Sequence, residues 1–398
     1  MLNRDFRLHL ASTVRSQLWI HADERAQSLF NLEWGLEKPW PNGTLGEGLL
    51  KAIVIPRIGR ASVLEVRELP DPLPGPGEVR IAVRAAGLNF AEVSARQGIY
   101  PDAPALPTVV GYEVAGTIDM LGKGVEGLAI GERVWALCRF GGHAELVCTR
   151  ANLVRPMPSG LTFIEAAAIP VAYSTAVMLV SSYGHIRPNE RVLIHMAAGG
   201  VGIAAIQLCR RVPGVTIFGT ASASKHDFLR KMGVDHPIDY RTQDFEPVVR
   251  DLTKGRGVHL VLDPMGGSHW KKNFRLLAPL GRLMLYGVAN AARPGTRSLL
   301  RVASQVLQSP RWRPMPLMDN NRAVMGLNMG KFFDEPEVIS AGLDELATLI
   351  DAGIAHPIID RVFPFSEAAA AHERIERREN IGKIVLVPSD SAAAAEAV

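Results

Sequence analysis

The segment "VLIHMAAGGVGIAAIQLCRR" (Val192–Arg211) joins two apolar runs through a turn of small residues that contains Gly199, Gly200 and Gly202. The first run suits a buried strand and the second, longer run suits a helix. A glycine turn between a strand and a helix favours dinucleotide binding, because N–H groups at the helix N-terminus attract a pyrophosphate. The glycines alone allow a second interpretation, a tight corner without a ligand, since Ala197 replaces the first glycine of the GxGxxG fingerprint.

The sequence that follows this turn supports the dinucleotide interpretation. A second strand, "TIFGT" (216–220), comes after the helical run at the distance that a βαβ unit requires. Further apolar runs, "HLVLD" and "RLMLYG", lack polar alternation, which is typical of strands covered on both faces of a parallel sheet. Residues 174–334 are therefore predicted to form a doubly wound, parallel-sheet α/β Rossmann domain.

The segments on either side have a different pattern. "GEVRIAVRAAG" (77–87) alternates apolar and polar residues after the turn "LPGPG", as a half-buried strand does. Residues 51–173 and 335–388, the latter ending in the strand "NIGKIVLVP", are predicted to form one β-rich domain. Residues 1–50 contain no motif and are treated as an N-terminal extension of unknown order. Residues 389–398 are predicted to be a flexible tail.

Composition argues against several classes of protein. The 398 residues carry a net charge of only +4, and the basic residues form no stripe, which argues against nucleic-acid binding. No run of 18 apolar residues exists, so no stable membrane insertion is expected. The first residues lack the apolar core of a secretory signal. Cys138, Cys148 and Cys209 fit neither a disulfide framework nor a zinc-binding spacing, which predicts a cytoplasmic protein.

The residues after the second strand predict NADPH rather than NADH. Enzymes that select NADH usually place Asp or Glu here to bind the ribose hydroxyls. This chain has "ASASK" (221–225), in which Ser222 offers a hydroxyl and Lys225 a cation, and the first carboxylate is Asp227. Such a site would attract a 2′-phosphate. In the alternative interpretation, Lys225 is a solvated residue at the start of a helix.

Several longer motifs resemble the medium-chain dehydrogenase/reductase superfamily. "GLNFAEVSARQGIYP", "VVGYEVAGTI", "AAGGVG", "DPMGG" and "IGKIVLVP" occur in the order typical of that superfamily. The chain resembles its quinone oxidoreductase (zeta-crystallin) division, and "VTIFGTASASKH" and "NNRAVMGLNMG" resemble homologues of the synaptic vesicle amine-transport membrane protein. The resemblance covers residues 51–388. It implies a GroES-like catalytic domain beside the Rossmann domain, and a homodimer.

The resemblance also implies that this chain holds no catalytic zinc. The ligand positions of the superfamily's alcohol dehydrogenases correspond here to Asn89, Tyr112 and Val171, and none of these is a typical zinc ligand. The four-cysteine lobe for a structural zinc is missing too. Without a metal to stabilise an alkoxide, the expected reaction is hydride transfer from NADPH to a quinone or to the β-carbon of an α,β-unsaturated carbonyl.

The resemblance assigns roles to individual residues. The amide of Asn89 would donate to the substrate oxygen, and Tyr112 and Tyr173 would shape the cleft or supply a proton. Packing alone would explain the two tyrosines equally well. The expected cofactor contacts are Gly199, Gly200, Val201 and Gly202 for the pyrophosphate, Ser222, Lys225 and Tyr240 for the 2′-phosphate, Thr175 for the nicotinamide, and Lys383 as a further contact.

Two other functions remain open at this stage. An enoyl reductase of a biosynthetic pathway would use the same cofactor site. A cofactor-binding protein that acts on a membrane or a partner would use the arginine-bearing segment around Arg311 and Arg313. The segment "HERIE" at His372 lacks the HExxH pattern of metalloproteases and is expected on a surface helix. Structural roles are expected for His195 and Asp263.

Overall fold

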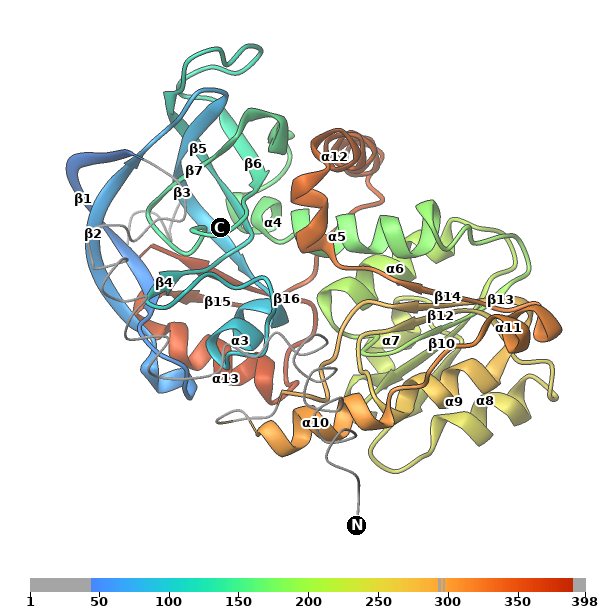
Figure 1. The fold of residues 1–398 in the computed structure, drawn as a ribbon. Coiled ribbons are helices and arrows are strands. Elements are labelled where there is room, and N and C mark those ends of the chain that lie inside the picture. The colour runs from blue at the N-terminus through green and yellow to red at the C-terminus, as the bar shows by residue number, and fades with distance from the viewer. Residues whose placement is uncertain (1–43, 293–294, 296–297, 389–398) are drawn as a thin grey trace.

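The structure, a computed structural model, describes residues 44–292, 295 and 298–388 (Figure 1). The expected tail and most of the expected N-terminal extension lie outside these residues. Strand β1 (Thr44–Ile55) begins before Lys51, so the expected domain boundary is wrong. Gly46 and Gly48 weaken the strand signal in the sequence, but Leu50 is buried and pairs with Leu69 of the neighbouring strand.

The β-rich domain is built on two sheets. Its other strands are β2 (Glu65–Leu73), β3 (Glu78–Leu88), β4 (Thr108–Val109), β5 (Glu113–Leu121), β6 (Arg133–Leu137), β7 (Leu146–Arg150), β8 (Val154–Pro156), β15 (Ile359–Pro364) and β16 (Lys383–Val387). The larger sheet has the order β15-β16-β3-β5-β6-β8, with β7 also paired to β3, and the smaller has the order β2-β1-β4. Val79, Ile81 and Val83 are buried on one face of β3, as the alternation predicts.

Helices lie at the margins of this domain and against its neighbour. They are α3 (Phe90–Arg96), α4 (Phe163–Ala167), α5 (Pro170–Val177), α12 (Pro336–Asp351) and α13 (Ala368–Glu376). Helix α13 is not the surface helix that the sequence suggested, because its Ala371 joins a core with Phe365 and strand β16, and His372 is fully buried.

The Rossmann domain contains a six-stranded sheet in which every pair of neighbours is parallel. Its strands are β9 (Arg191–Ile194), β10 (Thr216–Ala221), β11 (His236–Asp239), β12 (Val258–Asp263), β13 (Leu277–Leu285) and β14 (Ala323–Gly326). Its helices are α6 (Gly200–Arg210), α7 (His226–Lys231), α8 (Phe245–Leu252), α9 (Ser268–Leu276), α10 (Leu299–Gln308) and α11 (Pro314–Asn320). The order β11-β10-β9-β12-β13-β14 is that of a doubly wound dinucleotide-binding fold.

Both faces of this sheet are buried, which explains why its strands lack polar alternation. Val192 and Ile194 belong to the core that contains α5 and α6, whereas Leu193 between them packs with Phe245 and Val249 of α8 on the other face. The expected fold, a GroES-like β-rich domain beside a doubly wound parallel sheet, is confirmed (Figure 1). In the described part of the chain, none of the helices combines the length and the apolar character needed to span a bilayer.

The last part of the chain returns to the first domain. Strand β16 lies between β15 and β3, with Ile384 opposite Leu88. Just before β16, Gly382 forms a bridge to Gly199, and the N–H of Gly382 donates to the carbonyl of Ala198 at 2.8 Å. The C-terminal segment is therefore in direct contact with the glycine turn of the Rossmann domain.

Candidate functional site

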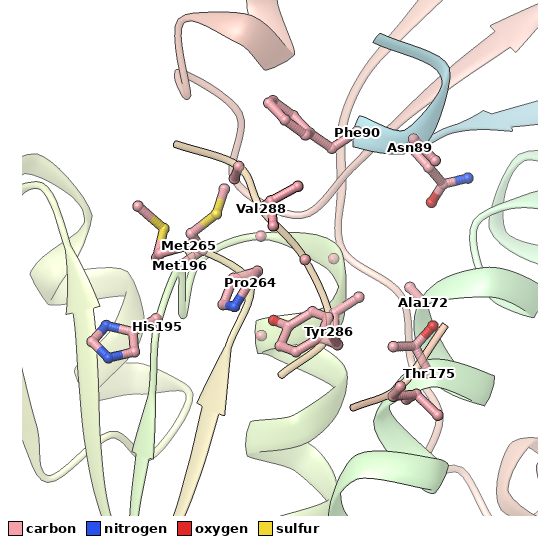
Figure 2. Close-up of a pocket in the computed structure, with 18 of the residues that line it drawn as sticks. Asn89, Phe90, Ala172, Thr175, His195, Met196, Pro264, Met265, Tyr286 and Val288 are labelled. Atoms are coloured by element: carbon pink, nitrogen blue, oxygen red, sulfur yellow. The ribbon is translucent and has the colours of Figure 1, made fainter. Parts of the chain in front are cut away.

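A cavity of about 1460 Å³ is lined by residues of both domains. Figure 2 shows Asn89 and Phe90 on the side of the β-rich domain, and Met196, Pro264 and Tyr286 on strand ends of the Rossmann domain. These three residues lie just after the carboxyl ends of the parallel strands β9, β12 and β13. Ligands of doubly wound folds bind at the carboxyl ends of the parallel strands, so the cavity lies where such a ligand is expected.

The glycine turn forms one wall of the cavity. A Cβ atom on Gly202 would lie 2.6 Å from the carbonyl oxygens of both Met196 and Ala197, so the turn can close only with glycine there. Gly199 is the N-cap of α6 and offers no side chain to the first N–H groups of the helix. These groups lack helical acceptors and are available to an anion. The cavity lining includes Gly199, Gly200, Val201 and Gly202.

A second part of the wall carries the residues expected near a 2′-phosphate. Ser222, Lys225 and Tyr240 all line the cavity, together with Arg241 and Arg378, which the sequence analysis did not single out. The ammonium of Lys225 donates to the carbonyl oxygens of Arg378 at 2.8 Å and Asn380 at 2.6 Å. Burial lowers the pKa of Lys225 to about 8. The two carbonyls occupy two of its three donors, which leaves one for a ligand.

A buried ion pair between β16 and β5 lies beside Asn89. The ammonium of Lys383 donates to Glu113 Oε1 at 2.5 Å, to Asn89 Oδ1 at 2.7 Å and to the carbonyl of Leu88 at 3.1 Å. The second oxygen of Glu113 accepts the backbone N–H of Val171 at 2.7 Å. The side chains of Lys383 and Glu113 are 5% and 0% exposed, so the pair is shielded from water. We call Lys383, Glu113, Asn89 and Glu92 the lysine network.

Asn89 is held by this network and does not point a donor into the cavity. Its amide nitrogen donates to Glu113 Oε1 at 2.8 Å and, more weakly, to Glu92 Oε1 at 3.4 Å. Both amide hydrogens are thereby engaged. The expectation that this amide donates to a substrate oxygen is therefore not supported, although Asn89 does line the cavity. The sequence analysis assigned no role to Glu113 or Glu92, so it did not predict that these two carboxylates bind the amide of Asn89.

Glu92 completes the network as a largely neutral group. Burial raises its pKa to about 8, and the charge of Lys383 only partly opposes this effect. Glu92 also accepts the backbone N–H of Asn89 at 2.9 Å, which makes it part of the capping box of α3. With Glu92 protonated at neutral pH, the network contains one cation and one anion, so its net charge is close to zero.

Tyr112 lines the cavity between two other aromatic rings. The rings of Tyr100 and Phe140 lie 6.0 and 5.1 Å from that of Tyr112. The Tyr112 hydroxyl is buried and makes no well-formed hydrogen bond within the described part of the chain. Burial, followed by the neighbouring Tyr100, raises its pKa far above the ordinary value, so it stays protonated. Its hydroxyl also interacts with that of Tyr100, which contributes to the raised pKa.

Tyr173 lies outside the cavity lining, so its expected place in the cleft is wrong. Its hydroxyl donates to Gln207 Oε1 at 2.8 Å, and the ring is buried between α5 and α6. Residues two positions apart on a helix face different sides. Thr175, two positions after Tyr173 on α5, does line the cavity (Figure 2). The Thr175 hydroxyl donates to the carbonyl of Val171 at 2.6 Å.

The residues at the superfamily's zinc position do not fit a zinc ion. Both polar atoms of Asn89 are engaged in the lysine network, Tyr112 is held in its protonated form, and Val171 has no ligating side-chain atom. Zinc prefers thiolate, imidazole and carboxylate ligands in a tetrahedral arrangement. The nearest carboxylate, Glu113, already binds Lys383 and the N–H of Val171.

His195 and Asp263 belong to a buried chain of hydrogen bonds behind the cavity. His195 contacts Thr220 Oγ1 at 3.1 Å and Asn273 Oδ1 at 2.9 Å through its two ring nitrogens, and Asn273 donates to Asp263 at 2.6 Å. The other oxygen of Asp263 accepts the N–H of Met265 at 2.5 Å. This chain ties together the ends of β9, β10 and β12, which is a structural role.

Two family models match the chain. The model described as zinc-binding dehydrogenase matches residues 232–386, and the model described as alcohol dehydrogenase GroES-like domain matches residues 75–159. Among curated proteins, the synaptic vesicle membrane protein VAT-1 homolog of Rattus norvegicus is 42% identical over 341 residues. That match covers 85% of this chain and 84% of the relative.

Solved structures with the same fold include one that contains NADPH and one enoyl reductase. Mycobacterial Rv1454c complexed with NADPH has a TM-score of 0.74 at 29% identity, covering 85% of this chain and 100% of that one. CurK enoyl reductase has a TM-score of 0.74 at 28% identity, covering 85% and 99%. By its motifs, its fold and its identity to the VAT-1 homolog, the chain belongs to the medium-chain dehydrogenase/reductase family of nicotinamide-dependent oxidoreductases.

Proposed function

We propose that the protein is an NADPH-dependent reductase of quinones or α,β-unsaturated carbonyls that works without zinc. The observation that carries this proposal is the composition of the cavity that both domains line. One part of its wall has a glycine turn and three cationic side chains, and the part at Asn89 has an ion pair in place of metal ligands. The NADPH bound to the similar mycobacterial structure supports the same cofactor here.

The cofactor would lie along the cavity from the phosphate contacts to Thr175. We assign the pyrophosphate to the first turn of α6, because its N–H groups lack acceptors and Gly202 allows the close turn. We assign the 2′-phosphate to Ser222, Lys225 and Tyr240, with Arg241 beside them. Lys383 would act indirectly, since its ammonium is fully engaged and its side chain packs against Gly200.

Replacing Lys225 with alanine is expected to raise the KM for NADPH by about 10-fold and to leave that for NADH nearly unchanged, because a charge-assisted bond to phosphate contributes about 1.5–3 kcal/mol before screening. Lys231→Ala is the matched control, because Lys231 is an exposed lysine in the last turn of α7, the helix for which Lys225 is the N-cap. Initial rates with both cofactors provide the measurement. Equal losses for NADPH and NADH would contradict the phosphate assignment.

The same lysine predicts a pH dependence. Its pKa is lowered to about 8, so the side chain is charged below that pH and neutral above it. Affinity for NADPH should therefore fall as the pH rises through about 8, in the wild type but not in Lys225→Ala, as kcat/KM against pH would measure.

When bound, NADPH would supply the hydride for a C–H bond at the β-carbon of an enone, or for reduction of a quinone. The electron pair of the double bond moves onto the substrate oxygen, and a proton from the Tyr112 hydroxyl or from water completes the reduced product. Tyr112 is the candidate for this role because the residue lines the cavity and its hydroxyl remains protonated. The lysine network would hold Asn89 and the start of α3 in place beside the substrate.

Replacing Tyr112 with phenylalanine is expected to lower kcat by about 5-fold and to change the KM for NADPH little. The estimate corresponds to one neutral hydrogen bond, about 1 kcal/mol, because water in the cavity can take over part of the role. Tyr173→Phe, whose hydroxyl lies outside the cavity, is the control. If the two variants have the same kcat, the assignment of Tyr112 fails.

The test of the function as a whole is the loss of nicotinamide absorbance when the protein meets NADPH or NADH with an ortho-quinone or a small enone, with and without a metal chelator. We expect chelator-resistant oxidation that is faster with NADPH. Loss of activity with the chelator, and its return with zinc, would overturn the zinc-independent assignment.

A second candidate is an enoyl reductase of thioesters, which the similarity to CurK enoyl reductase favours. Reduction of an enoyl thioester by a protein that reduces no quinone would support this second function.

We also propose a homodimer, as the family resemblance implies. The outer strand β14 pairs only with β13 within the described residues, so its other edge is open to a second copy. Sedimentation velocity would measure the mass, and a monomer at micromolar concentration would count against the dimer.

A further inference from the structure

The wall of the cavity beyond Tyr112 is made by two segments that lie far apart in the sequence. The first is residues 99–101, after α3, and the second is residues 327–333, between β14 and α12. The ring of Tyr100 in the first segment lies 6.0 Å from that of Tyr112. The residues assigned above to the pyrophosphate and the 2′-phosphate belong to neither segment. This wall therefore encloses the substrate end of the cavity.

Asp102 joins the two segments. Its carboxylate oxygens accept from the side-chain amide of Asn328 and from the ammonium of Lys331, each at 2.8 Å. Burial alone would raise the pKa of Asp102, but the hydrogen bonds from Lys331 and Asn328 outweigh this effect and lower the pKa below its ordinary value. Asp102 is therefore ionised at neutral pH, and both contacts are charge-assisted. We call Asp102, Asn328 and Lys331 the Asp102 bridge.

Gly330 lets the two segments approach closely at this bridge. A Cβ atom on Gly330 would lie 3.2 Å from Asp102 Oδ2 and 3.3 Å from the hydroxyl of Tyr100. The N–H of Gly330 donates to Asn328 Oδ1 at 3.0 Å, which leaves the amide nitrogen of Asn328 for Asp102. The contact between the segments is thus tightly packed, and its polar groups are matched.

The wall is thin at the bridge. Lys331 lines the cavity, yet its side chain is 65% exposed, whereas that of Asp102 is 13% exposed. At this point the bridge itself separates the cavity from water. The same segment carries a second ion pair, Arg139 with Asp334 at 2.7 Å, but both side chains are about half exposed and neither residue lines the cavity. Such an outer pair contributes little to closure.

The space behind the bridge suits an apolar group. Ile99 of the first segment and Leu327 and Phe332 of the second contribute apolar side chains to the lining. An alkyl group attached to the carbonyl carbon of a substrate that reacts beside Tyr112 would leave water and pack here. A longer group would reach the Asp102 bridge.

We propose that the Asp102 bridge closes the substrate end of the cavity and thereby limits the size of the group on the substrate's carbonyl carbon. This inference rests on the proposed reductase function and narrows its substrates to compact enones and quinones without a long side chain. Asp102 is a positioning residue in this role, because it acts by holding Asn328 and Lys331 in place.

The test measures kcat/KM for straight-chain enones in which the alkyl group on the carbonyl carbon grows by one methylene at a time. For the wild type, we expect kcat/KM to rise while added methylenes are buried, and then to fall by about 10-fold when the chain reaches the bridge. In Asp102→Ala the fall should be absent or should move to longer chains, with the KM for NADPH unchanged. Lys331→Met breaks the bridge from the other side and should shift the profile in the same direction.

Asp334→Ala is the matched control, because it breaks the exposed pair with Arg139 in the same segment. We expect it to keep the wild-type profile of kcat/KM against chain length. The same fold-loss at every chain length in Asp102→Ala would show that the bridge only supports the structure, and it would overturn the proposal while the reductase function stands. A wild-type profile without a fall would overturn it too.

Failure of the reductase function would give a different result, since no enone would then be reduced. In that case, calorimetric titration of saturated ketones of the same chain lengths into the NADP⁺-saturated protein decides. An affinity that drops beyond one chain length in the wild type, but not in Asp102→Ala, supports the bridge. Any other pattern refutes it.

Discussion

Replacing Gly202 with alanine is expected to weaken NADPH binding by about 30- to 100-fold, or about 2–3 kcal/mol. The added Cβ would lie 2.6 Å from two carbonyl oxygens, those of Met196 and Ala197. Both belong to the backbone of the turn and cannot rotate away. The start of α6 must therefore move, and the N–H groups proposed to bind the pyrophosphate move with it.

Gly199→Ala is the matched control for this experiment. Its backbone is already extended, with φ at −85°, and its new Cβ would meet a carbonyl only at 3.3 Å. We expect a change of no more than a few fold. Fluorescence titration with NADPH would give both dissociation constants, and circular dichroism would show that both variants fold. Similar affinities for the two variants would contradict the proposed role of the turn.

The second large effect is expected for the buried ion pair. Lys383→Met should lower the free energy of unfolding by about 3–5 kcal/mol, because it leaves the carboxylate of Glu113 buried without its cation. Methionine preserves much of the packing of the lysine stem against Gly200, so the loss would come mainly from the charge. Urea unfolding monitored by circular dichroism gives the measurement.

Two further variants separate the pair from its surroundings. Adding Glu113→Gln to Lys383→Met removes the unpaired charge, and we expect it to restore part of the lost stability. Arg230→Met breaks an exposed pair with Asp227 and should cost less than about 1 kcal/mol. A Lys383→Met protein as stable as the Arg230→Met protein would show that the ion pair contributes no special stability.

The elements that depend on local pattern were predictable from the sequence. The glycine turn, the apolar strands of the Rossmann sheet and the alternation in β3 each follow from neighbouring residues, and the structure has them where they were expected. The start of β1 was missed because Gly46 and Gly48 resemble a loop, and only pairing with β2 reveals a strand.

The details of the site depend on contacts between distant residues. Lys383 and Glu113 are 270 positions apart, so no local pattern could show that they bind each other and, through Asn89, remove a donor from the cavity. The sequence could not show that Thr175 lines the cavity and Tyr173 does not, because this depends on which side of α5 faces the cavity. A charged residue in an otherwise apolar motif, such as Glu113 in "GYEVAGTI", is the signal that could have been used.

The return of the chain to the first domain has a consequence for synthesis on the ribosome. Strand β3 is synthesised before the Rossmann domain, but its neighbour β16 is synthesised after it. Until then the end of β3 that pairs with β16, residues 86–88, exposes unpaired backbone groups to other nascent chains. The Rossmann domain, whose strands are contiguous in sequence, can fold in the meantime. The side of the cavity at Asn89 can therefore form fully only after both the Rossmann domain and β16 have been synthesised.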